Sequence, residues 1–232
     1  MLRLIAVLLL LTAPVRAATE AAPFQPSPGF KLRSPALAAG ALVWLHGSYD
    51  TDATPTPPAE PRWVTRIHRS GYDIWRFDRT PGRDPLGESG GLLVMGLEQL
   101  RAAGYRQIVV AGHSRGAFIA LAALERPDLV DAVAAISPAA HGTRAERRPQ
   151  ALSDFSARLA AVGPARLALV LLRDDPLDPD PAARLAIARA SRAVILGIDR
   201  PQRPRGHMGG YEPDFDRRYG ACLTRFLTGG RC

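Results

Sequence analysis

Short apolar runs alternate with longer amphipathic segments along most of the chain. The apolar runs have the length and the flanking turn residues that are typical of buried strands. They cover residues 41–45, 72–77, 107–111, 130–136, 167–172 and 193–198. The amphipathic segments, in which apolar residues recur at helical spacing, cover residues 62–70, 92–103, 117–126, 152–162, 181–191 and 215–227. This alternation predicts an α/β fold built from βαβ units, with a mostly parallel central sheet and helices on both faces.

The loops that follow the strands are where such a sheet carries function, because ligands bind beyond the carboxyl ends of parallel strands. Residues 51–61, after the first strand, are rich in proline, and residues 143–149, after the fourth, are rich in arginine. Each loop is interpreted either as a solvated connection or as a wall of a substrate cleft. Only 30 residues, Ser137 to Arg166, separate the fourth strand from the fifth. This spacing leaves no room for a large lid domain.

The first residues have the pattern of an export signal. Arg3 gives a basic start, residues 4–12 are almost wholly apolar, and Val15-Arg16-Ala17 provides a cleavage site for a signal peptidase. The apolar run is far shorter than the roughly 20 residues that cross a bilayer, so we expect no stable membrane anchor after cleavage. We predict a signal peptide over 1–17, an extended segment over 18–40 and one domain over 41–232, in a periplasmic or secreted protein.

Charge and cysteine usage narrow the class of protein. The formal net charge is +8, and removal of Arg3 and Arg16 with the leader lowers it to +6. The remaining arginines are scattered among carboxylates, whereas a phosphate-binding face gathers them, so we expect no nucleic-acid partner. Cys222 and Cys232 are the two cysteines of the chain. In an oxidising compartment they are expected to form a disulfide that pins the tail to the last helix.

The segment Gly112-His113-Ser114-Arg115-Gly116 carries the clearest chemical signal. It lies between a predicted strand and a predicted helix of small residues, the context of a G-x-S-x-G nucleophile elbow. The turn of such an elbow is so tight that the positions two residues to either side of the serine must lack bulk, which explains the glycines. The turn pushes the serine into the cleft. We therefore predict that Ser114 is a nucleophile.

A second segment, Gly87-Glu88-Ser89-Gly90-Gly91, matches the same pattern in a different context. It follows Pro81, Gly82 and Pro85 in a loop, and no strand leads into it. Nothing there would hold a serine in a fixed, strained turn. We interpret Ser89 as a cap of the helix predicted from Leu92.

A serine hydroxyl is a poor nucleophile near neutral pH, so it requires a base within hydrogen-bond reach. His207 is the predicted base, because it lies between glycines in the loop after the last strand. His141, after the fourth strand, is the alternative. His113 is expected to point away from the site; His46 ends a strand and His68 lies on a solvated helix face.

The base in turn requires a carboxylate that orients it. Three candidates follow the fifth predicted strand within five residues. Asp175 is the first choice, and Asp174 and Asp178 remain alternatives, since either could instead cap the helix that Pro181 begins.

Backbone amides of two turns could stabilise a developing oxyanion. The elbow offers the amide of Arg115, and the glycine turn Leu45-His46-Gly47-Ser48 at the end of the first strand offers the amide of Ser48. The chain has no H-E-x-x-H, no paired CxxC and no phosphate-binding GxGxxG after a strand. We therefore expect a site that uses no metal and no organic cofactor.

These landmarks together resemble the α/β-hydrolase superfamily, from residue 41 to about residue 227. The order of serine, acid and histidine, the His46-Gly47 turn and the elbow are each similar to that family. The resemblance implies its fold and a triad of Ser114, Asp175 and His207, with oxyanion amides on Ser48 and Arg115. The small esterase and dienelactone-hydrolase-like branches are the most similar. Because few residues precede the first strand, the antiparallel strands that often begin the family are expected to be absent or reduced.

The resemblance implies a hydrolase that acts on a small-molecule ester. We expect cleavage of a carboxylic ester through an acyl-enzyme, carried out by Ser114, His207 and Asp175. An amidase or a thioesterase could use the same triad, and a silent scaffold of this fold could bind an envelope partner through its arginines. The oligomeric state stays open at this point.

Overall fold

The computed structural model describes residues 23–48, 56–79, 85–160, 162–178 and 180–232. The predicted signal peptide, residues 1–17, lies outside the described residues, as do positions 18–22 of the predicted extended segment. The strands are β1 (Gln25–Pro26), β2 (Gly40–Leu45), β3 (Tyr72–Phe77), β4 (Ile108–His113), β5 (Ala132–Ile136), β6 (Arg166–Leu171) and β7 (Val194–Asp199). They form one sheet in the order β1-β3-β2-β4-β5-β6-β7. All neighbours in it pair in parallel except β1, which runs antiparallel to β3.

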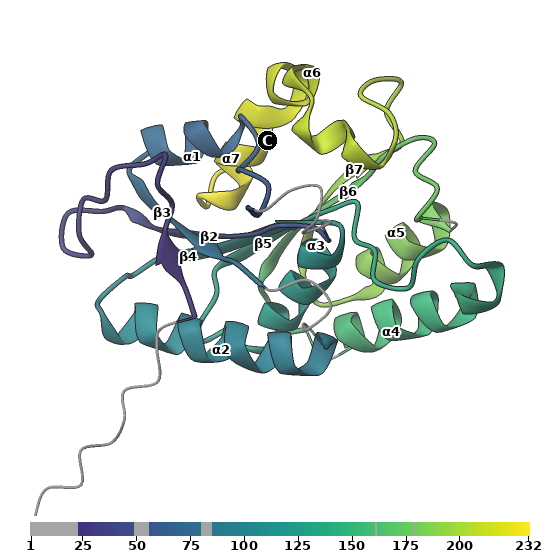
Figure 1. Ribbon diagram of the computed structural model, residues 1–232, viewed down its shortest axis with the longest axis horizontal. Helices are drawn as coiled ribbons and strands as arrows, with labels where there is room; N and C mark the ends of the chain where they lie inside the picture. The colour runs from purple at the N-terminus through teal and green to yellow at the C-terminus, as the bar shows by residue number, and fades with distance from the viewer. Residues whose placement is uncertain (1–22, 49–55, 80–84, 161, 179) are drawn as a thin grey trace, which may run out of the picture.

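Helices cover both faces of this sheet (Figure 1). They are α1 (Val64–Arg69), α2 (Leu86–Ala102), α3 (Arg115–Ala120), α4 (Arg148–Ala160), α5 (Pro181–Ala190), α6 (Pro213–Phe215) and α7 (Ala221–Leu227). Shorter turns are η1 (Leu121–Glu125), which continues α3, η2 (Ala145–Arg147), η3 (His207–Tyr211) and η4 (Asp216–Gly220). The predicted α/β architecture is therefore confirmed. In the part of the chain that the structure describes, no large additional domain interrupts it.

Two apolar clusters, one on each side of the sheet, hold the layers together. Alternate residues of a strand point to opposite faces. In β4, Val109 and Ala111 pack into the cluster beneath α1 and α7, while Ile108 and Val110 pack into the cluster beneath α2, α3, α4 and α5. Because both faces are covered, the central strands are apolar along their whole length, and for this reason they appear in the sequence as unbroken apolar runs.

The helix α2 begins earlier than predicted, and this corrects the interpretation of Ser89. The helix was expected from Leu92 with Ser89 as its cap, but it begins at Leu86 and Ser89 lies inside it, 2% exposed. The later start was predicted because Pro81, Gly82 and Pro85 indicate a loop and no strand leads into the segment. Gly90 faces η1 at ordinary van der Waals distance, since a Cβ added there would lie 3.6 Å from the Cβ of Ala122. Residues 86–91 therefore belong to a helix that packs on η1, and not to the preceding loop.

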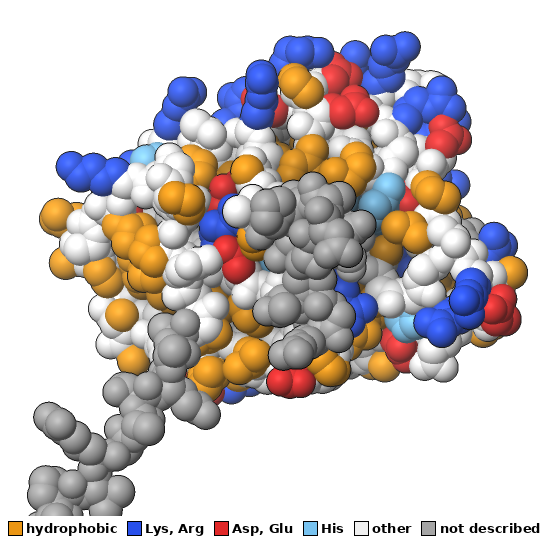
Figure 2. All heavy atoms as spheres, in the orientation of Figure 1, with side chains coloured by type: hydrophobic (Ala, Val, Ile, Leu, Met, Phe, Trp, Pro, Cys, Tyr) orange, Lys and Arg blue, Asp and Glu red, His pale blue; other side chains and the backbone are white. Residues whose placement is uncertain are grey.

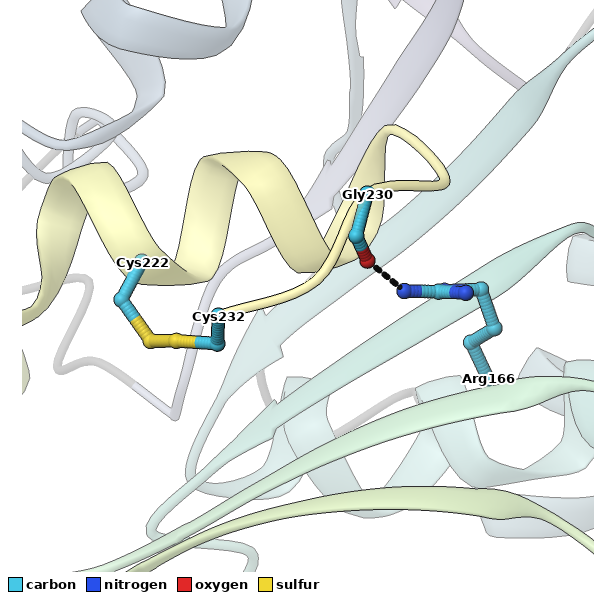
Figure 3. Close-up of a disulfide and its surroundings, with 4 residues drawn as sticks. All are labelled: Arg166, Cys222, Gly230 and Cys232. Atoms are coloured by element: carbon cyan, nitrogen blue, oxygen red, sulfur yellow. Dashed lines mark hydrogen bonds between the residues drawn. A yellow bond between two sulfur atoms is a disulfide. The ribbon is translucent and has the colours of Figure 1, made fainter.

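The two ends of the described chain are fastened to the sheet differently. At the start, the short strand β1 is the one antiparallel strand among the described residues, where the sequence predicted such strands to be absent or reduced. At the end, Cys222 and Cys232 form the predicted disulfide (Figure 3). Arg166 of β6 donates to the carbonyl oxygens of Phe226 and Gly230 and lies over the Phe226 ring. The disulfide thus attaches the tail to α7, and Arg166 attaches it to β6.

Candidate active site

Ser114 occupies a strained turn between β4 and α3. Its backbone φ is 55° and its ψ is −121°, a region that residues with a side chain rarely adopt and that costs about 1–3 kcal/mol. The side chain is buried, and the residue is 8% exposed. Strain of this kind persists only where the surrounding structure enforces it, and it is concentrated at functional sites.

Both glycines of the turn are required by close backbone contacts. A Cβ added to Gly112 would lie 2.5 Å from the carbonyl carbon of Gly116. A Cβ added to Gly116 would meet the carbonyl oxygens of Leu45 and His46 at the end of β2. The elbow is therefore packed directly against the carboxyl end of the neighbouring strand β2.

Asp175 and His207 meet at the carboxyl edge of the sheet, beyond β6 and β7. The Nδ1 atom of His207 lies 2.9 Å from both carboxylate oxygens of Asp175. The acid side chain is 1% exposed and the histidine side chain is 16% exposed. Their loops are joined by a hydrogen bond from the Gly206 amide to the Arg173 carbonyl oxygen, at 2.7 Å.

The electrostatics of this pair favour an ionised acid. Burial raises the pKa of Asp175, but the hydrogen bond and the charge of His207, together with the amide of Leu177 at 2.9 Å from Oδ1, outweigh burial and lower the pKa below its ordinary value. Asp175 is thus a carboxylate that accepts the Nδ1 proton of His207. This contact leaves Nε2 of His207 as the atom that can accept a proton.

The alternative acids are engaged elsewhere. Asp174 is 56% exposed and pairs with Arg205 on the surface. Asp178 is buried and lies 3.4 Å from the Nε atom of Arg184 on α5. Among the three carboxylates, Asp175 is the one that contacts His207.

The alternative base also has a different partner. The Nε2 atom of His141 lies 2.7 Å from Asp154 of α4, and its ring packs edge-on against Phe118.

His68 contacts the Lys31 carbonyl oxygen at the surface. His46 is buried; its Nδ1 lies 2.6 Å from the Gly47 carbonyl oxygen and its Nε2 accepts from the Arg79 amide at 3.0 Å.

His113 lies in the site, which corrects the expectation that it points away. Its Nε2 lies 2.8 Å from the carbonyl oxygen of His207, and the two rings are 4.8 Å apart. Tyr211 packs edge-on against the same ring. Burial lowers the pKa of His113 to about 4, so the ring is neutral near pH 7 and donates its Nε2 proton to that carbonyl. Adjacency to the serine was the only signal in the sequence, and it does not reveal which way the side chain turns.

Ser114, His113 and His207 line one cavity of about 250 Å³. Its other lining residues are Gly47, Ser48, Pro58, Arg115, Ala139, Ala140, Gly142, Leu177, Met208 and Tyr211. The Nε2 atom of His207 is buried and has no hydrogen-bond partner in the described part of the structure. Such contacts often tighten only once substrate is bound. The cavity is therefore a place where an acyl group could meet both the hydroxyl and the imidazole.

The two predicted amide donors border this cavity. Arg115 is the first residue of α3, and the amides of a first helical turn point out of the helix. Gly47 packs so tightly on the elbow that a Cβ added there would lie 3.1 Å from the Cβ of Ser114. Ser48, the next residue, lines the same cavity as the serine.

The proline-rich loop reaches the cavity, and the arginine-rich loop begins next to it. Pro58, from the proline-rich loop, lines it, as does Gly142, which directly precedes the arginine-rich loop.

Arginine and lysine side chains on the face seen in Figure 2 are interspersed with aspartate and glutamate. Within residues 23–232, apart from the undescribed positions, no group of three His, Cys, Asp or Glu side chains could hold a metal ion. No helix of the described chain is both long and apolar enough to cross a membrane.

Comparisons with known proteins point to one fold. Residues 94–172 match the model of a family described as the alpha/beta hydrolase fold. An esterase of Pyrococcus furiosus is similar at 19% identity and a TM-score of 0.57, over 82% of each chain. A monoacylglycerol lipase of Paleococcus ferrophilus is similar at 14% identity and 0.57, over 82% of this chain and 94% of that one.

A third solved structure comes from a larger protein. An acylaminoacyl peptidase of Pyrococcus horikoshii is similar at 13% identity and a TM-score of 0.59, over 90% of this chain and 40% of that one. A search of curated proteins finds no match. At such identities the likeness concerns the fold.

Proposed function

We propose, on the premise that this chain has the α/β-hydrolase fold, that it is a serine hydrolase that cleaves carboxylic esters of small molecules. One observation carries the proposal. A serine in a strained elbow and a histidine held by a buried carboxylate line the same cavity, although they come from positions 114, 175 and 207 of the chain. Stable packing of the fold does not require a strained serine and a carboxylate-bound histidine at the same cavity.

The proposed reaction proceeds through an acyl-enzyme. The Ser114 oxygen attacks the ester carbonyl carbon while its proton moves to Nε2 of His207. The amides of Ser48 and Arg115 stabilise the oxyanion of the tetrahedral intermediate, and each such donor contributes about 3–4 kcal/mol. His207 then protonates the leaving alkoxide, so the alcohol departs and the acyl group stays on the serine. Water, deprotonated by His207, attacks the acyl-enzyme and releases the acid.

Ester cleavage is the leading candidate because most of the similar solved structures named by activity are esterases or lipases. Amide and thioester cleavage remain candidates, because the same triad performs them. A panel of nitrophenyl esters, nitroanilides and thioesters of equal acyl length separates the three.

Labelling with a fluorophosphonate tests the nucleophile directly. We expect a mass adduct on Ser114 at neutral to mildly alkaline pH, and no adduct in Ser114→Ala or His207→Ala. Ser89→Ala is the matched control, because Ser89 also lies in a G-x-S-x-G segment but is buried inside α2. An unlabelled wild-type protein would favour the silent scaffold that binds a partner.

We further propose export to the periplasm or the medium. The leader pattern of residues 1–17 supports it, and so does the disulfide, since such bonds persist in oxidising compartments. Mass analysis of the mature protein should find an N-terminus at Ala18. An intact N-terminus on a soluble cytoplasmic protein would contradict this.

A further inference from the structure

An arginine lies buried behind the proposed site, where its charge has no role in the mechanism above. Arg184 of α5 is 2% exposed, in contact with Asp178 at 3.4 Å. Its NH1 atom donates to the Pro138 carbonyl oxygen, and its guanidinium lies 5.3 Å from the centre of the Phe155 ring. One side chain of α5 therefore joins the loop after β6 to the loop after β5.

Burying this pair is costly, so its presence needs an explanation. An apolar pair of similar volume usually gives equal or greater stability than a buried ion pair. Here Asp178 Oδ2 is buried without a hydrogen-bond partner among the described atoms. Burial raises the pKa of Asp178 and lowers that of Arg184, so desolvation outweighs their mutual attraction. Stability of the fold is therefore a weak reason for keeping the pair.

Both loops that Arg184 joins lead directly to the triad. The amide of Asp178 donates to the carbonyl oxygen of Asp175, at 3.2 Å, which closes the turn that carries the acid. On the other side, Ala139, the residue after Pro138, donates its amide to the carbonyl oxygen of Ser114 at 3.1 Å. Arg184 thus contacts the residue that makes the first of these hydrogen bonds and the direct neighbour of the residue that makes the second.

We propose that Arg184, together with Asp178, is a positioning residue that fixes the Asp175 turn and the Ser114 elbow relative to each other. The inference rests on the proposed function for its catalytic consequence. The position of Asp175 relative to His207, which the inference concerns, can be measured without a substrate. Arg184 contacts no lining residue of the cavity in the hydrogen bonds and ion pairs described, so its effect on catalysis passes through Asp178 and Pro138.

The test compares Arg184→Met with Arg158→Met in the full mature chain. Arg158, on α4, forms a surface ion pair with Glu125 at 2.8 Å and serves as the matched control. In Arg184→Met we expect kcat to fall about 10- to 100-fold with KM within about twofold, because a displacement near 1 Å can cost about 100-fold. The acidic limb of the kcat/KM profile should move to lower pH, since a displaced carboxylate stabilises the imidazolium less. Arg184→Lys, which keeps the charge, should be intermediate.

Proton NMR supplies the measurement that does not depend on turnover. A downfield resonance from the Nδ1 proton of His207 reports its hydrogen bond to Asp175. We expect Arg184→Met to lose or shift it and Arg158→Met to retain it. If Arg184→Met fails to fold, the double variant Asp178→Asn/Arg184→Met removes both charges together, and it should fold while showing the same two losses.

The outcomes separate the inference from the proposed function. A resonance and a kcat in the folded Arg184 variants equal to those of Arg158→Met would overturn the inference, whatever the wild-type activity. A wild-type protein that cleaves no ester, yet loses the resonance on Arg184→Met, would support the positioning role and refute the proposed function.

Discussion

At the scale of single residues, the site depends on a few buried polar groups with defined partners. Asp175 is held ionised beside His207, while His46 and His113 are held neutral by burial. In the sequence, three carboxylates were candidates for the acid and the base had to be chosen among five histidines, and the sequence does not show which of them are in contact in the fold. Partners decide their roles, because the pKa of a buried group follows from its surroundings and not from its type.

Asp175→Asn should reduce kcat by about 10³- to 10⁴-fold, because an amide no longer stabilises the imidazolium and can hold His207 in the wrong tautomer. Steady-state kinetics on the best nitrophenyl ester measures this. Asp174→Asn is the matched control and should stay within about twofold, since Asp174 pairs with Arg205 at the surface. Equal losses in both variants would contradict the assignment of the acid.

Two histidines should make the fold sensitive to acid. The pKa of His46 is lowered to about 4 by burial and by the charge of Arg79, and that of His113 is lowered to about 4 by burial. Between pH 6.5 and 4 the unfolded chain therefore binds more protons than the folded one. The free energy of unfolding is highest above pH 6.5 and falls towards pH 4, by about 3 kcal/mol for each histidine.

Urea midpoints measured from pH 7.5 to 4.5 test this expectation. The variant His113→Gln should show a shallower fall with pH than the wild type, since one of the two proton-binding sites is removed. An identical slope in the two proteins would show that His113 is not one of the groups that titrate.

At the scale of elements, the elbow is a junction in which two backbones touch. Gly116→Ala should cost about 3 kcal/mol or more and abolish labelling of Ser114, because the new Cβ would meet the carbonyl oxygens of Leu45 and His46. Gly91→Ala is the control, since its position in α2 is exposed with no atom within 4 Å of the added Cβ. That change should stabilise the protein by about 1 kcal/mol. Thermal unfolding and fluorophosphonate labelling report both effects.

At the scale of the whole molecule, the C-terminal tail is bonded to α7, the helix that covers part of one face of the sheet. The disulfide joins residues ten positions apart. In the chain-entropy model, a loop of that length contributes about 3 kcal/mol. The variant Cys222→Ser/Cys232→Ser should therefore lower Tm by about 6–12 °C. Its kcat should not change, since the tail makes no described contact with the cavity lining. A large loss of kcat without a change in Tm would contradict a purely structural role.

The sequence by itself determined the architecture and the elbow. Runs of apolar residues in β2, β4 and β6 have no polar face, so they could be stable only between two layers of helices. The pattern of Gly112, Ser114 and Gly116 is equally local, because a tight strand-to-helix turn imposes its own steric requirement within five residues. Local steric requirements and hydrophobic periodicity follow from residues that are neighbours in the sequence, so they can be predicted without knowing which distant residues meet.

Only the tertiary structure decided which polar groups meet. That Asp175 and not Asp178 contacts His207, that His113 lies against His207, and that Arg184 joins two loops depend on contacts between residues 32 to 94 positions apart, or on loops that meet only in the folded sheet. Ser89 was misplaced for a related reason, since α2 packs on its neighbouring helices and begins in a segment that the preceding Pro81, Gly82 and Pro85 had indicated to be a loop. Side-chain partners are set by the energetics of burial, and burial exists only once the chain has folded.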